Sequence, residues 1–317
     1  MRRVLVTGGA GFLGTRITAL LAEHPEVDLV VCGDLRDSDV PGVLSVPVDV
    51  TDPDALPEVL QRHRIEAVVH LAAIVNPGRD AAMEFRVDVQ GSANVLAACV
   101  EASVRRLVVS SSGAAYGYHA DNPRWIDETD PLRGNDGFPY SRHKRLIEEM
   151  LAAARAAHPD LEQVVFRIGT ILGPDVQNQI TKLWDAKRIL RIAGSDSPFV
   201  FVWVDDVARA MVHAVVGAGP AGIYNVAGDG TMTVPQIARR LRKPLRTVPA
   251  PLLALALGIG GALHVTEHGP EKIPFLRYRP VLHNRRLKEE FGYTPALSTV
   301  QAFEEYVRTH PGVVRRA

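Results

Sequence analysis

Cysteine is scarce in this sequence, and its scarcity narrows the classes of site that the chain can carry. The 317 residues include two cysteines, Cys32 and Cys99, and both lie inside apolar runs. A disulfide framework or a cysteine-rich metal site is therefore disfavoured, and we expect buried free thiols in a reducing compartment. The expectation that follows is a cytoplasmic protein without a bound metal.

An excess of charge of one sign is also missing. Lysine plus arginine and aspartate plus glutamate number 36 each, so the formal net charge is zero. This balance argues against a nucleic-acid surface covering the whole molecule. The opening residues MRRVLVTGG enter a strand and a turn directly, without the architecture of a secretory signal. We expect a small-molecule substrate and no nucleic-acid partner.

Long apolar runs are absent too, apart from one short segment. PLLALALGIGGAL, from Pro251 to Leu263, is shorter than the roughly 20 residues that a membrane-spanning helix needs. We interpret it as a helix buried against the rest of the protein. The alternatives are an apolar wall of a substrate pocket and a surface that rests on a membrane.

What the sequence does contain is a regular alternation of apolar strands and helix-length segments through its first half. Segments such as RRVLVTG, VDLVVCGD, AVVHLAA, RLVVSSS and QVVFRIG are apolar throughout and are separated by helical patterns near residues 15–23, 54–63 and 81–102. This rhythm predicts an α/β fold with a doubly wound, Rossmann-like parallel sheet that helices cover on both faces. We expect residues 1–170 to form this domain, together with roughly residues 200–228. Residues 171–199 and 229–317 are expected to form a smaller, mainly helical substrate-binding portion.

A glycine-rich turn follows the first expected strand. VTGGAGFLG satisfies the spacing G-x-G-x-x-G and also places Gly8, Gly11 and Gly14 three residues apart. Glycines at the opening of a helix let the backbone approach a pyrophosphate at the helix N-terminus. Asp34 follows at the end of the second strand, where a carboxylate can bind the ribose hydroxyls and repel a 2′-phosphate, so NAD is favoured over NADP. Arg36 leaves NADP open, because its guanidinium is able to bind that phosphate.

Two further strand ends complete the expected cofactor site. Asp49 ends the third strand, where an adenine edge would lie, and HLAAIV ends the fourth with small residues that leave room for a flat cofactor. His70 is interpreted as a packed core histidine without a catalytic role. The expected cofactor contacts are Gly8, Gly11, Phe12, Leu13, Gly14, Asp34, Leu35, Arg36, Asp49, Val50, Leu71, Ala72, Ala73, Tyr140 and Lys144.

The hexapeptide PYSRHK, from Pro139 to Lys144, places a tyrosine four positions before a lysine. On a helix these positions share a face, and an ammonium a few Å from Tyr140 favours its phenolate form. The upstream SSSGAAYG, from Ser110 to Gly117, follows the fifth expected strand and supplies hydroxyls that can bind a carbonyl. The tyrosine is therefore a candidate for proton exchange with a substrate.

Together these motifs resemble the extended short-chain dehydrogenases/reductases of the NAD-dependent epimerase/dehydratase family, in particular the subgroup similar to UDP-glucose 4-epimerase. TGGAGFLG, HLAA, SSSGAAYG, YSRHK, FVWVDDVARAMVHAV, IYNVAGDG and FGYTPALS occur in the family's order over nearly the whole length. The resemblance implies that Ser112 orients the reacting oxygen, that Tyr140 is the acid/base, and that Lys144 also binds the nicotinamide ribose. It also implies a homodimer through the helices around residues 81–102 and 140–157.

Three departures from the family pattern leave the substrate open. Asp88 in DVQGS replaces an expected asparagine, Thr170 in RIGTILGP replaces a substrate-binding asparagine, and AGSDSPFVFVWVDD lacks an arginine that helps to hold a diphosphate. The remaining candidate cations for a diphosphate are Lys182, Lys187, Arg188, Arg191, Arg277 and Arg279.

Three functions therefore stay open on the sequence. The first is an NAD-dependent epimerase or dehydratase that oxidises a hydroxyl of a nucleotide sugar. The second is an NAD(P)-dependent dehydrogenase or reductase of a less polar alcohol or ketone, similar to hydroxysteroid or flavonoid reductases. The third is a cofactor-binding regulator that has lost catalysis, which the intact set of Ser112, Tyr140 and Lys144 opposes.

Overall fold

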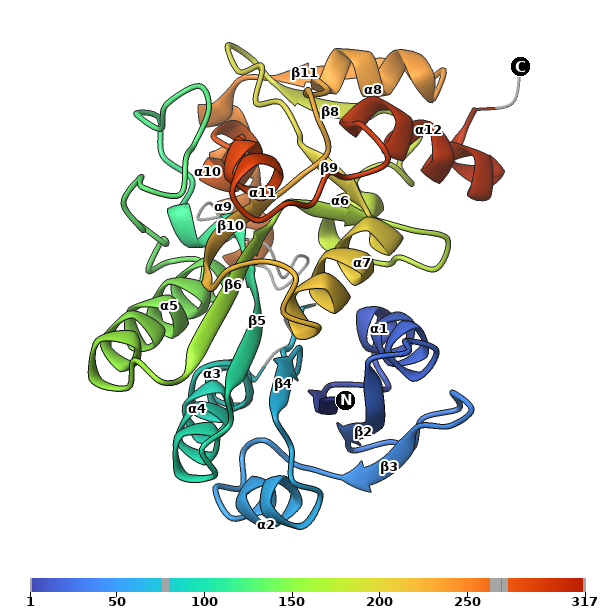
Figure 1. Ribbon diagram of the computed structural model, residues 1–317. Coiled ribbons are helices and arrows are strands. Elements are labelled where there is room, and N and C mark those ends of the chain that lie inside the picture. Colours follow the sequence, from blue (N-terminus) through green and yellow to red (C-terminus); the bar gives the residue numbers. More distant parts are fainter. Residues whose placement is uncertain (1, 76–79, 263–268, 270–272, 316–317) are drawn as a thin grey trace.

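A parallel sheet of seven strands forms the centre of the molecule (Figure 1). A computed structural model describes residues 2–75, 80–262, 269 and 273–315. In sheet order the strands are β10 (Gly222–Val226), β6 (Glu162–Ile168), β5 (Arg106–Ser112), β4 (Ala67–His70), β1 (Arg2–Thr7), β2 (Val27–Asp34) and β3 (Leu44–Pro47). All pairings in this sheet are parallel, which confirms the predicted doubly wound α/β fold.

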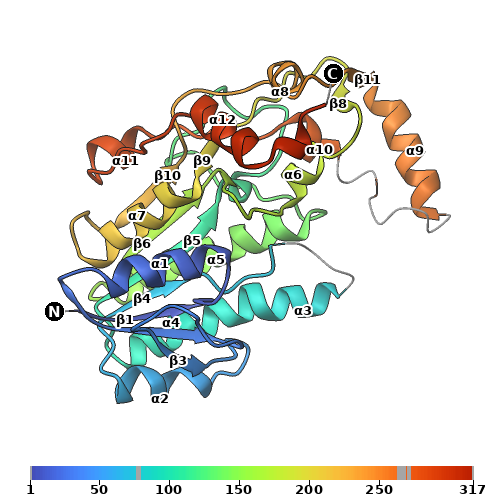
Figure 2. The same cartoon turned by 90° about the vertical axis from the view of Figure 1, so that its right-hand side faces the viewer.

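Helices cover both faces of the sheet, as the apolar strands require (Figure 2). The helices are α1 (Phe12–Ala22), α2 (Ala55–Arg62), α3 (Ala81–Phe85), α4 (Gly91–Glu101), α5 (Pro139–Ala157), α6 (Gln179–Lys182), α7 (Val204–Val215), α8 (Val234–Arg240), α9 (Ala250–Ala262), α10 (Ile273–Arg277), α11 (Arg285–Glu289) and α12 (Thr299–Thr309). Side chains of α1 and α7 pack on one face, and those of α2, α4 and α5 pack on the other. Both faces of the sheet are therefore buried under helices. The edge formed by the carboxyl ends of the strands carries polar residues such as Asp34 and the serines of β5.

The helix expected over residues 81–102 is present in three consecutive pieces. Between α3 and α4 the chain forms a π-helical segment, Arg86–Gln90, in which Asp88 is buried. A π-helical segment accommodates one extra residue in a helix and is found most often at functional sites. It aims Asp88 inward, toward α5.

Both cysteines are buried free thiols, as predicted. Cys32 lies in β2 and Cys99 in α4, and burial raises the pKa of both, to about 11 and about 12. Neutral thiols of this kind behave as small apolar side chains.

The mainly helical C-terminal part is built around an aromatic cluster. Two small sheets pair β7 (Thr170–Leu172) with β9 (Phe201–Trp203) and β8 (Ile189–Ile192) with β11 (Leu245–Val248). Trp184 is 1% exposed and makes edge contacts with Phe199, Phe201, Phe303 and Tyr306. This cluster fixes α12 and the segment around Phe199 beside the end of the main sheet.

The expectation for the apolar run at residues 251–263 was half wrong. Residues Ala250–Ala262 form the helix α9, but Leu252 and Leu255 are 60% and 61% exposed, so the helix is not buried. The run is apolar on every side, and the protein body can cover only one of those sides. Leu263 lies outside the described residues. Among the described residues, no helix combines the length and apolarity needed to cross a bilayer.

Candidate active site

A cavity of about 740 Å³ opens at the carboxyl ends of the central strands. This volume is typical of sites for small molecules, and the edge of a doubly wound sheet is where such molecules bind. Sixteen positions were predicted as site residues from the sequence, and all but Lys144 line this cavity: Gly8, Gly11, Phe12, Leu13, Gly14, Asp34, Leu35, Arg36, Asp49, Val50, Leu71, Ala72, Ala73, Ser112 and Tyr140. We call the lining around Gly8, Gly11, Gly14, Asp34 and Ala72 the glycine part.

In the glycine turn, neighbouring backbone atoms lie too close to Gly8 and Gly14 to leave room for a side chain. Gly8 has a φ of +72°, and a Cβ atom there would lie 2.8 Å from the backbone nitrogen of Ala72. A Cβ atom on Gly14 would overlap the carbonyl oxygen of Gly8. α1 begins directly after this turn, and its N-cap Gly11 has no side chain to satisfy the first backbone N–H groups. These N–H groups and the helix dipole therefore offer a site for an anion such as a pyrophosphate.

Asp34 and Arg36 lie together at the end of β2. Asp34 accepts hydrogen bonds from the backbone nitrogens of Ala10 at 3.1 Å and Arg36 at 3.2 Å. The Arg36 guanidinium donates to the carbonyl of Ala10 at 2.9 Å and is 4.0 Å from the Asp34 carboxylate. The Asp34 side chain is 14% exposed, so its carboxylate faces the cavity edge with capacity for further donors, such as ribose hydroxyls.

The flat part of the lining comes from β3 and β4. Asp49 accepts from the backbone and side chain of Thr51 at 2.9 and 2.8 Å, which holds the chain after β3 in a tight turn. Leu71, Ala72 and Ala73 follow β4 with small or apolar side chains. Together they leave a planar gap suited to a ring system.

The three serines at the end of β5 have different partners. The Ser112 hydroxyl accepts from the backbone nitrogen of Ala114 at 3.1 Å and caps a short 3₁₀ turn, Gly113–Tyr116. The Ser111 hydroxyl donates to Glu148 of α5 at 2.5 Å, and the carbonyl of Ser110 accepts from the Lys144 ammonium at 2.8 Å. Ser112 therefore keeps its hydroxyl proton available for a molecule in the cavity, whereas the Ser111 proton is committed to Glu148.

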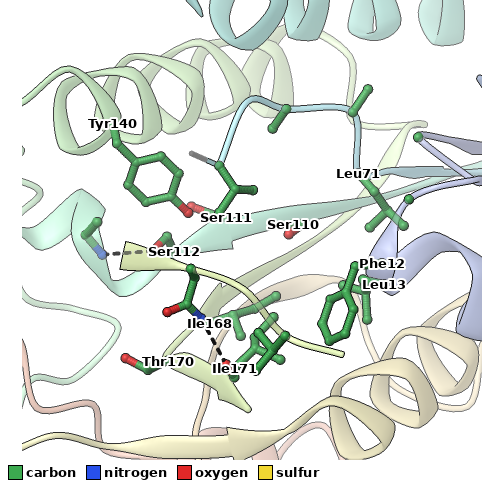
Figure 3. Close-up of a pocket in the computed structure, with 18 of the residues that line it drawn as sticks. Phe12, Leu13, Leu71, Ser110, Ser111, Ser112, Tyr140, Ile168, Thr170 and Ile171 are labelled. Carbon is green, nitrogen blue, oxygen red and sulfur yellow. Dashed lines mark hydrogen bonds between the residues drawn. The ribbon is translucent and has the colours of Figure 1, made fainter. Parts of the chain in front are cut away.

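Tyr140 and Lys144 lie on the same face of α5, whose first residue is Pro139. The Lys144 ammonium is 5.8 Å from the centroid of the Tyr140 ring. Figure 3 shows the Tyr140 ring directed from α5 toward the serines, with Phe12 and Leu13 across the cavity. Lys144 itself is buried and is not part of the cavity lining.

Asp88 and His143 form a buried pair next to Lys144. His143 donates from Nδ1 to the Asp88 carboxylate at 2.9 Å, and the other carboxylate oxygen accepts from the backbone nitrogen of Ile74 at 2.8 Å. Asp88 is 3% exposed and His143 is 4% exposed. The acid that stands in place of the family's asparagine thus ties the segment after β4 to α5.

A second buried network holds α5 against the sheet. Arg167 of β6 and Glu148 of α5 form an ion pair at 2.7 Å, with side chains 4% and 2% exposed. Arg167 also donates to the Tyr116 hydroxyl at 2.8 Å, and Tyr116 donates to Asn225 at 2.9 Å. Because removing one partner of a buried pair leaves an uncompensated charge, this network fixes the position of α5 strongly.

His70 is a structural residue, as interpreted from the sequence. Ser92 donates to the carbonyl of Asp88, so it accepts from Nε2 of His70 at 2.9 Å, and Nδ1 accepts from Thr7 at 2.7 Å. Burial and the neighbouring Lys144 ammonium lower the pKa of His70 to about 3. The ring is therefore neutral and fully bonded at physiological pH.

The other part of the lining is aromatic, and sequence reasoning missed most of it. The rings of Phe138 and Phe275 stack at 5.5 Å, and Tyr118 makes edge contacts with both. Phe199 joins them from the C-terminal part. Tyr118 directly follows SSSGAAYG and Phe138 precedes Tyr140 by two residues, so their proximity to known motifs was the available signal. With Arg279, these four rings make up what we call the aromatic part.

Arg279 is the candidate diphosphate-binding cation that lines the cavity. Of the six candidate cations named from the sequence, it alone lines the cavity among the described residues. It donates to the carbonyl and hydroxyl of Ser197 at 3.1 and 3.0 Å, and its guanidinium lies 3.9 Å from the ring centroid of Phe199. No carboxylate pairs with it among the described residues, and its Nε has no partner there. Desolvation lowers its pKa to about 9, so at neutral pH an uncompensated positive charge faces the cavity.

Thr170 and Asn178 also line the cavity. Thr170 is the first residue of β7, whereas the Asn178 side chain accepts from the backbone nitrogens of Ile180 and Thr181 at 2.9 Å and caps α6. The amide of Asn178 is thus occupied by the capping box. Sequence reasoning did not single out this asparagine.

Known proteins resemble this chain in sequence. An uncharacterised protein of Mycobacterium tuberculosis is 29% identical over 321 residues, which cover 96% of this chain and 83% of that protein. The UDP-glucose 4-epimerase of Azospirillum brasilense is 32% identical over 181 residues, which cover 55% of this chain and 50% of that enzyme.

Solved structures share the fold over almost the whole chain. The UDP-glucose 4-epimerase of Thermotoga maritima, solved with UDP-glucose, is 22% identical, covers 98% of this chain and 99% of its own, and has a TM-score of 0.74. The UDP-glucose 4-epimerase of Thermus thermophilus, solved with NAD, is 24% identical, with coverage of 96% and 99% and a TM-score of 0.72.

The model of the NAD-dependent epimerase/dehydratase family matches residues 4–227, which carry the glycine turn, the serines and the Tyr140–Lys144 pair. The chain therefore belongs to this family and is an NAD-dependent enzyme.

Proposed function

We propose that the enzyme oxidises a hydroxyl of a nucleotide sugar, with Tyr140 as the acid/base. The observation that carries the proposal is the position of Tyr140, which lines the same cavity as the glycine turn and has Lys144 on its own helix face. Bound NAD supplies the hydride chemistry, whereas the protein supplies position and the proton. The cradle fits this cofactor, because Gly8 and Gly14 leave backbone-lined space that a Cβ atom would fill.

Each residue of the set has one role in this proposal. Tyr140 takes the hydroxyl proton as the carbinol carbon is oxidised and returns it when the carbonyl is reduced. Lys144 stabilises the negative charge on the phenolic oxygen from behind the cavity wall, held by the carbonyl of Ser110. Ser112 donates its hydroxyl proton to the substrate oxygen and orients it. Asp34 accepts from the ribose hydroxyls and disfavours a 2′-phosphate.

Arg279 supports the nucleotide sugar as the substrate class. Its unpaired guanidinium lies in the cavity, and planar guanidinium groups bind phosphate oxygens in a bidentate way. The similarity to UDP-glucose 4-epimerases points in the same direction. Arg279 thus supplies the positive charge that AGSDSPFVFVWVDD lacks.

A less polar alcohol or ketone is the second candidate, and the aromatic part favours it. Phe138 and Phe275 present rings without hydrogen-bonding groups next to Tyr140, and Tyr118 adds a third ring. Thr170 stands where sugar-nucleotide enzymes of the family commonly have an asparagine. A sugar ring makes more hydrogen bonds than these walls offer, whereas a flat apolar ring matches them.

Replacing Tyr140 with phenylalanine tests the acid/base role. Loss of a positioned acid/base lowers turnover by about a thousandfold, while NAD affinity stays within about twofold because the ring is retained. The measurement is turnover of an identified substrate together with NAD titration. Tyr278→Phe is the matched control, because it removes a hydroxyl from a tyrosine that does not line the cavity. Unchanged turnover of Tyr140→Phe would show that the assignment is wrong.

A ligand screen separates the two substrate classes. A ligand that binds only the folded state raises the melting temperature, so UDP and UDP-sugars are compared with aromatic and steroid-like ketones in the presence of NAD. Stabilisation by UDP at millimolar concentration supports the nucleotide sugar. Stabilisation by the apolar ketones alone supports the second candidate. Net release of NADH then distinguishes a dehydrogenase from an epimerase, which returns the hydride.

We also propose a homodimer through α3, α4 and α5 and a cytoplasmic location. The support is the resemblance to the family and the buried free thiols. Light scattering of the purified chain gives the oligomeric state directly.

A further inference from the structure

α9 is apolar around its whole circumference and extends away from the body of the protein (Figure 2). Its sequence, APLLALALGIGGA, contains no charged or hydrogen-bonding side chain. Leu252 and Leu255 are 60% and 61% exposed. Surface helices of globular proteins normally place a polar face toward water, so an exposed helix without one indicates a contact surface.

The chain before α9 is strongly basic. We call Arg239, Arg240, Arg242, Lys243 and Arg246 the basic segment, and no acidic residue lies between Asp229 and Glu267. Within it, Arg240 pairs with Glu304, and Lys243 donates to the carbonyl of Trp184. Arg239, Arg242 and Arg246 make no ion pair among the described residues, and Arg242 and Arg246 are exposed. Positive charge therefore accumulates at the base of the apolar helix.

A hollow of about 760 Å³ brings the two features together. Apolar side chains of α9, β8 and β11 line it: Leu190, Val248, Leu252, Leu253 and Ala256. Lys187, Arg188 and Arg246 line the same hollow, and none of them has an ion-pair partner among the described residues. Among the residues that the structure describes, no acidic side chain lines this hollow. Apolar surface and unpaired cations thus face the same direction.

This combination matches an anionic lipid surface better than it matches a second copy of the chain. Binding to an anionic membrane strengthens with the apolar area that enters the acyl boundary and with the lysine and arginine residues that face the headgroups, and this surface supplies both. Its 13 residues span about 20 Å, which is too short to cross a hydrocarbon core of about 30 Å. In a twofold dimer the same patch would face itself, so Lys187, Arg188 and Arg246 would meet like charges.

We propose that α9 and the cations beside it dock the enzyme on an anionic lipid surface, with α9 lying in the plane of the interface. Leu252 and Leu255 enter the acyl boundary, while Lys187, Arg188 and Arg246 face the phosphate groups. The proposal does not depend on which substrate the cavity takes.

Sedimentation with vesicles tests this proposal on the full chain with NAD. We expect binding to vesicles of phosphatidylcholine with about one third phosphatidylglycerol, weak binding to phosphatidylcholine alone, and a decrease in binding at high salt. Leu252→Glu/Leu255→Glu should abolish binding. Lys187→Glu/Arg246→Glu should lower it by at least about 25-fold, because each cation near the surface contributes about fivefold.

The matched control is Arg62→Glu/Arg124→Glu, which makes the same charge change at two exposed arginines of the main domain. It should bind anionic vesicles as the unmodified protein does. All variants should keep the NAD-induced rise in melting temperature, which shows that they are folded.

Three results would overturn the proposal. The first is equal binding to neutral and anionic vesicles, and the second is undiminished binding by Leu252→Glu/Leu255→Glu. The third is a dimer of the unmodified protein that dissociates in Leu252→Glu/Leu255→Glu, because a second copy would then cover this face.

Discussion

The glycine part and the aromatic part of one cavity are built in opposite ways. The glycine part consists mainly of backbone, and its residues follow the ends of three strands within the first 73 residues. The aromatic part consists of large side chains drawn from residues as far apart as Tyr118 and Arg279. The two parts thus differ in origin, because the glycine part is encoded by local turns and the aromatic part is assembled by the tertiary structure.

The largest loss of NAD affinity is expected from a side chain added at Gly14, where the glycine part has no room for a Cβ atom. Gly14→Ala places a Cβ atom against the Gly8 carbonyl, so the turn must open, and NAD affinity should fall by about a hundredfold, equivalent to about 2.7 kcal/mol. Calorimetric titration measures this loss. Gly312→Ala is the control, since a Cβ atom there meets nothing within 4 Å. If Gly14→Ala kept its NAD affinity, close approach of NAD to the backbone of the glycine turn would not be needed for binding.

Arg279→Met should weaken substrate binding at the aromatic part and leave NAD binding at the glycine part unchanged. If the substrate is a nucleotide sugar, losing a charge-assisted contact raises its KM by about thirtyfold, while NAD affinity is unchanged. Steady-state kinetics and NAD titration provide the two readouts. Arg277→Met is the control, because Arg277 stacks on Tyr278 at 4.8 Å and does not line the cavity. Equal effects on both ligands would show that the two parts are not independent.

Asp34→Ala should lower the ratio of NAD affinity to NADP affinity by about tenfold. Removing the carboxylate relaxes discrimination against NADP, because Arg36 remains nearby to bind a 2′-phosphate. The ratio of NAD to NADP affinity gives the measurement. Asp34→Ala/Arg36→Ala should lose the gained NADP affinity again. Tight NADP binding by the unmodified protein would contradict the role of Asp34.

The last prediction concerns His70 and the pH dependence of folding rather than ligand binding, and His70 is hydrogen-bonded to Thr7 directly before the glycine turn. Its folded pKa of about 3 is below its ordinary value of 6.5, so between these values the unfolded chain binds more protons. The free energy of unfolding should therefore fall as pH decreases through this window, by up to about 1.4 kcal/mol per pH unit. His70→Asn should lack this component of the slope in urea unfolding at pH values above and below 6.5. Parallel slopes for both proteins would show that His70 is not buried in the neutral form.

The sheet and the glycine part were predictable because their signals are local. Apolar strands alternate with helices in chain order, the glycine turn directly follows β1, and Asp34 and the serines are the last residues of β2 and β5. The Asp88–His143 pair was not predictable, because its residues are 55 positions apart and no motif joins them. The aromatic part was not predictable as a unit, because its rings come from separate segments around residues 118, 138, 199 and 275. The exposure of α9 was missed for another reason: apolar composition indicates burial, but it does not identify what covers the helix.

The π-helical segment Arg86–Gln90 makes the contact between α5 and the chain after β4 sensitive to insertions and deletions within the segment itself. Because one residue turns an α-helix by about 100°, deleting a single residue here would rotate α4 relative to α3 by that angle. Asp88 would then lose Ile74 and His143 together. The number of residues in this segment therefore matters as much as the identity of Asp88. This holds although Val87 is the one residue of the segment that lines the cavity.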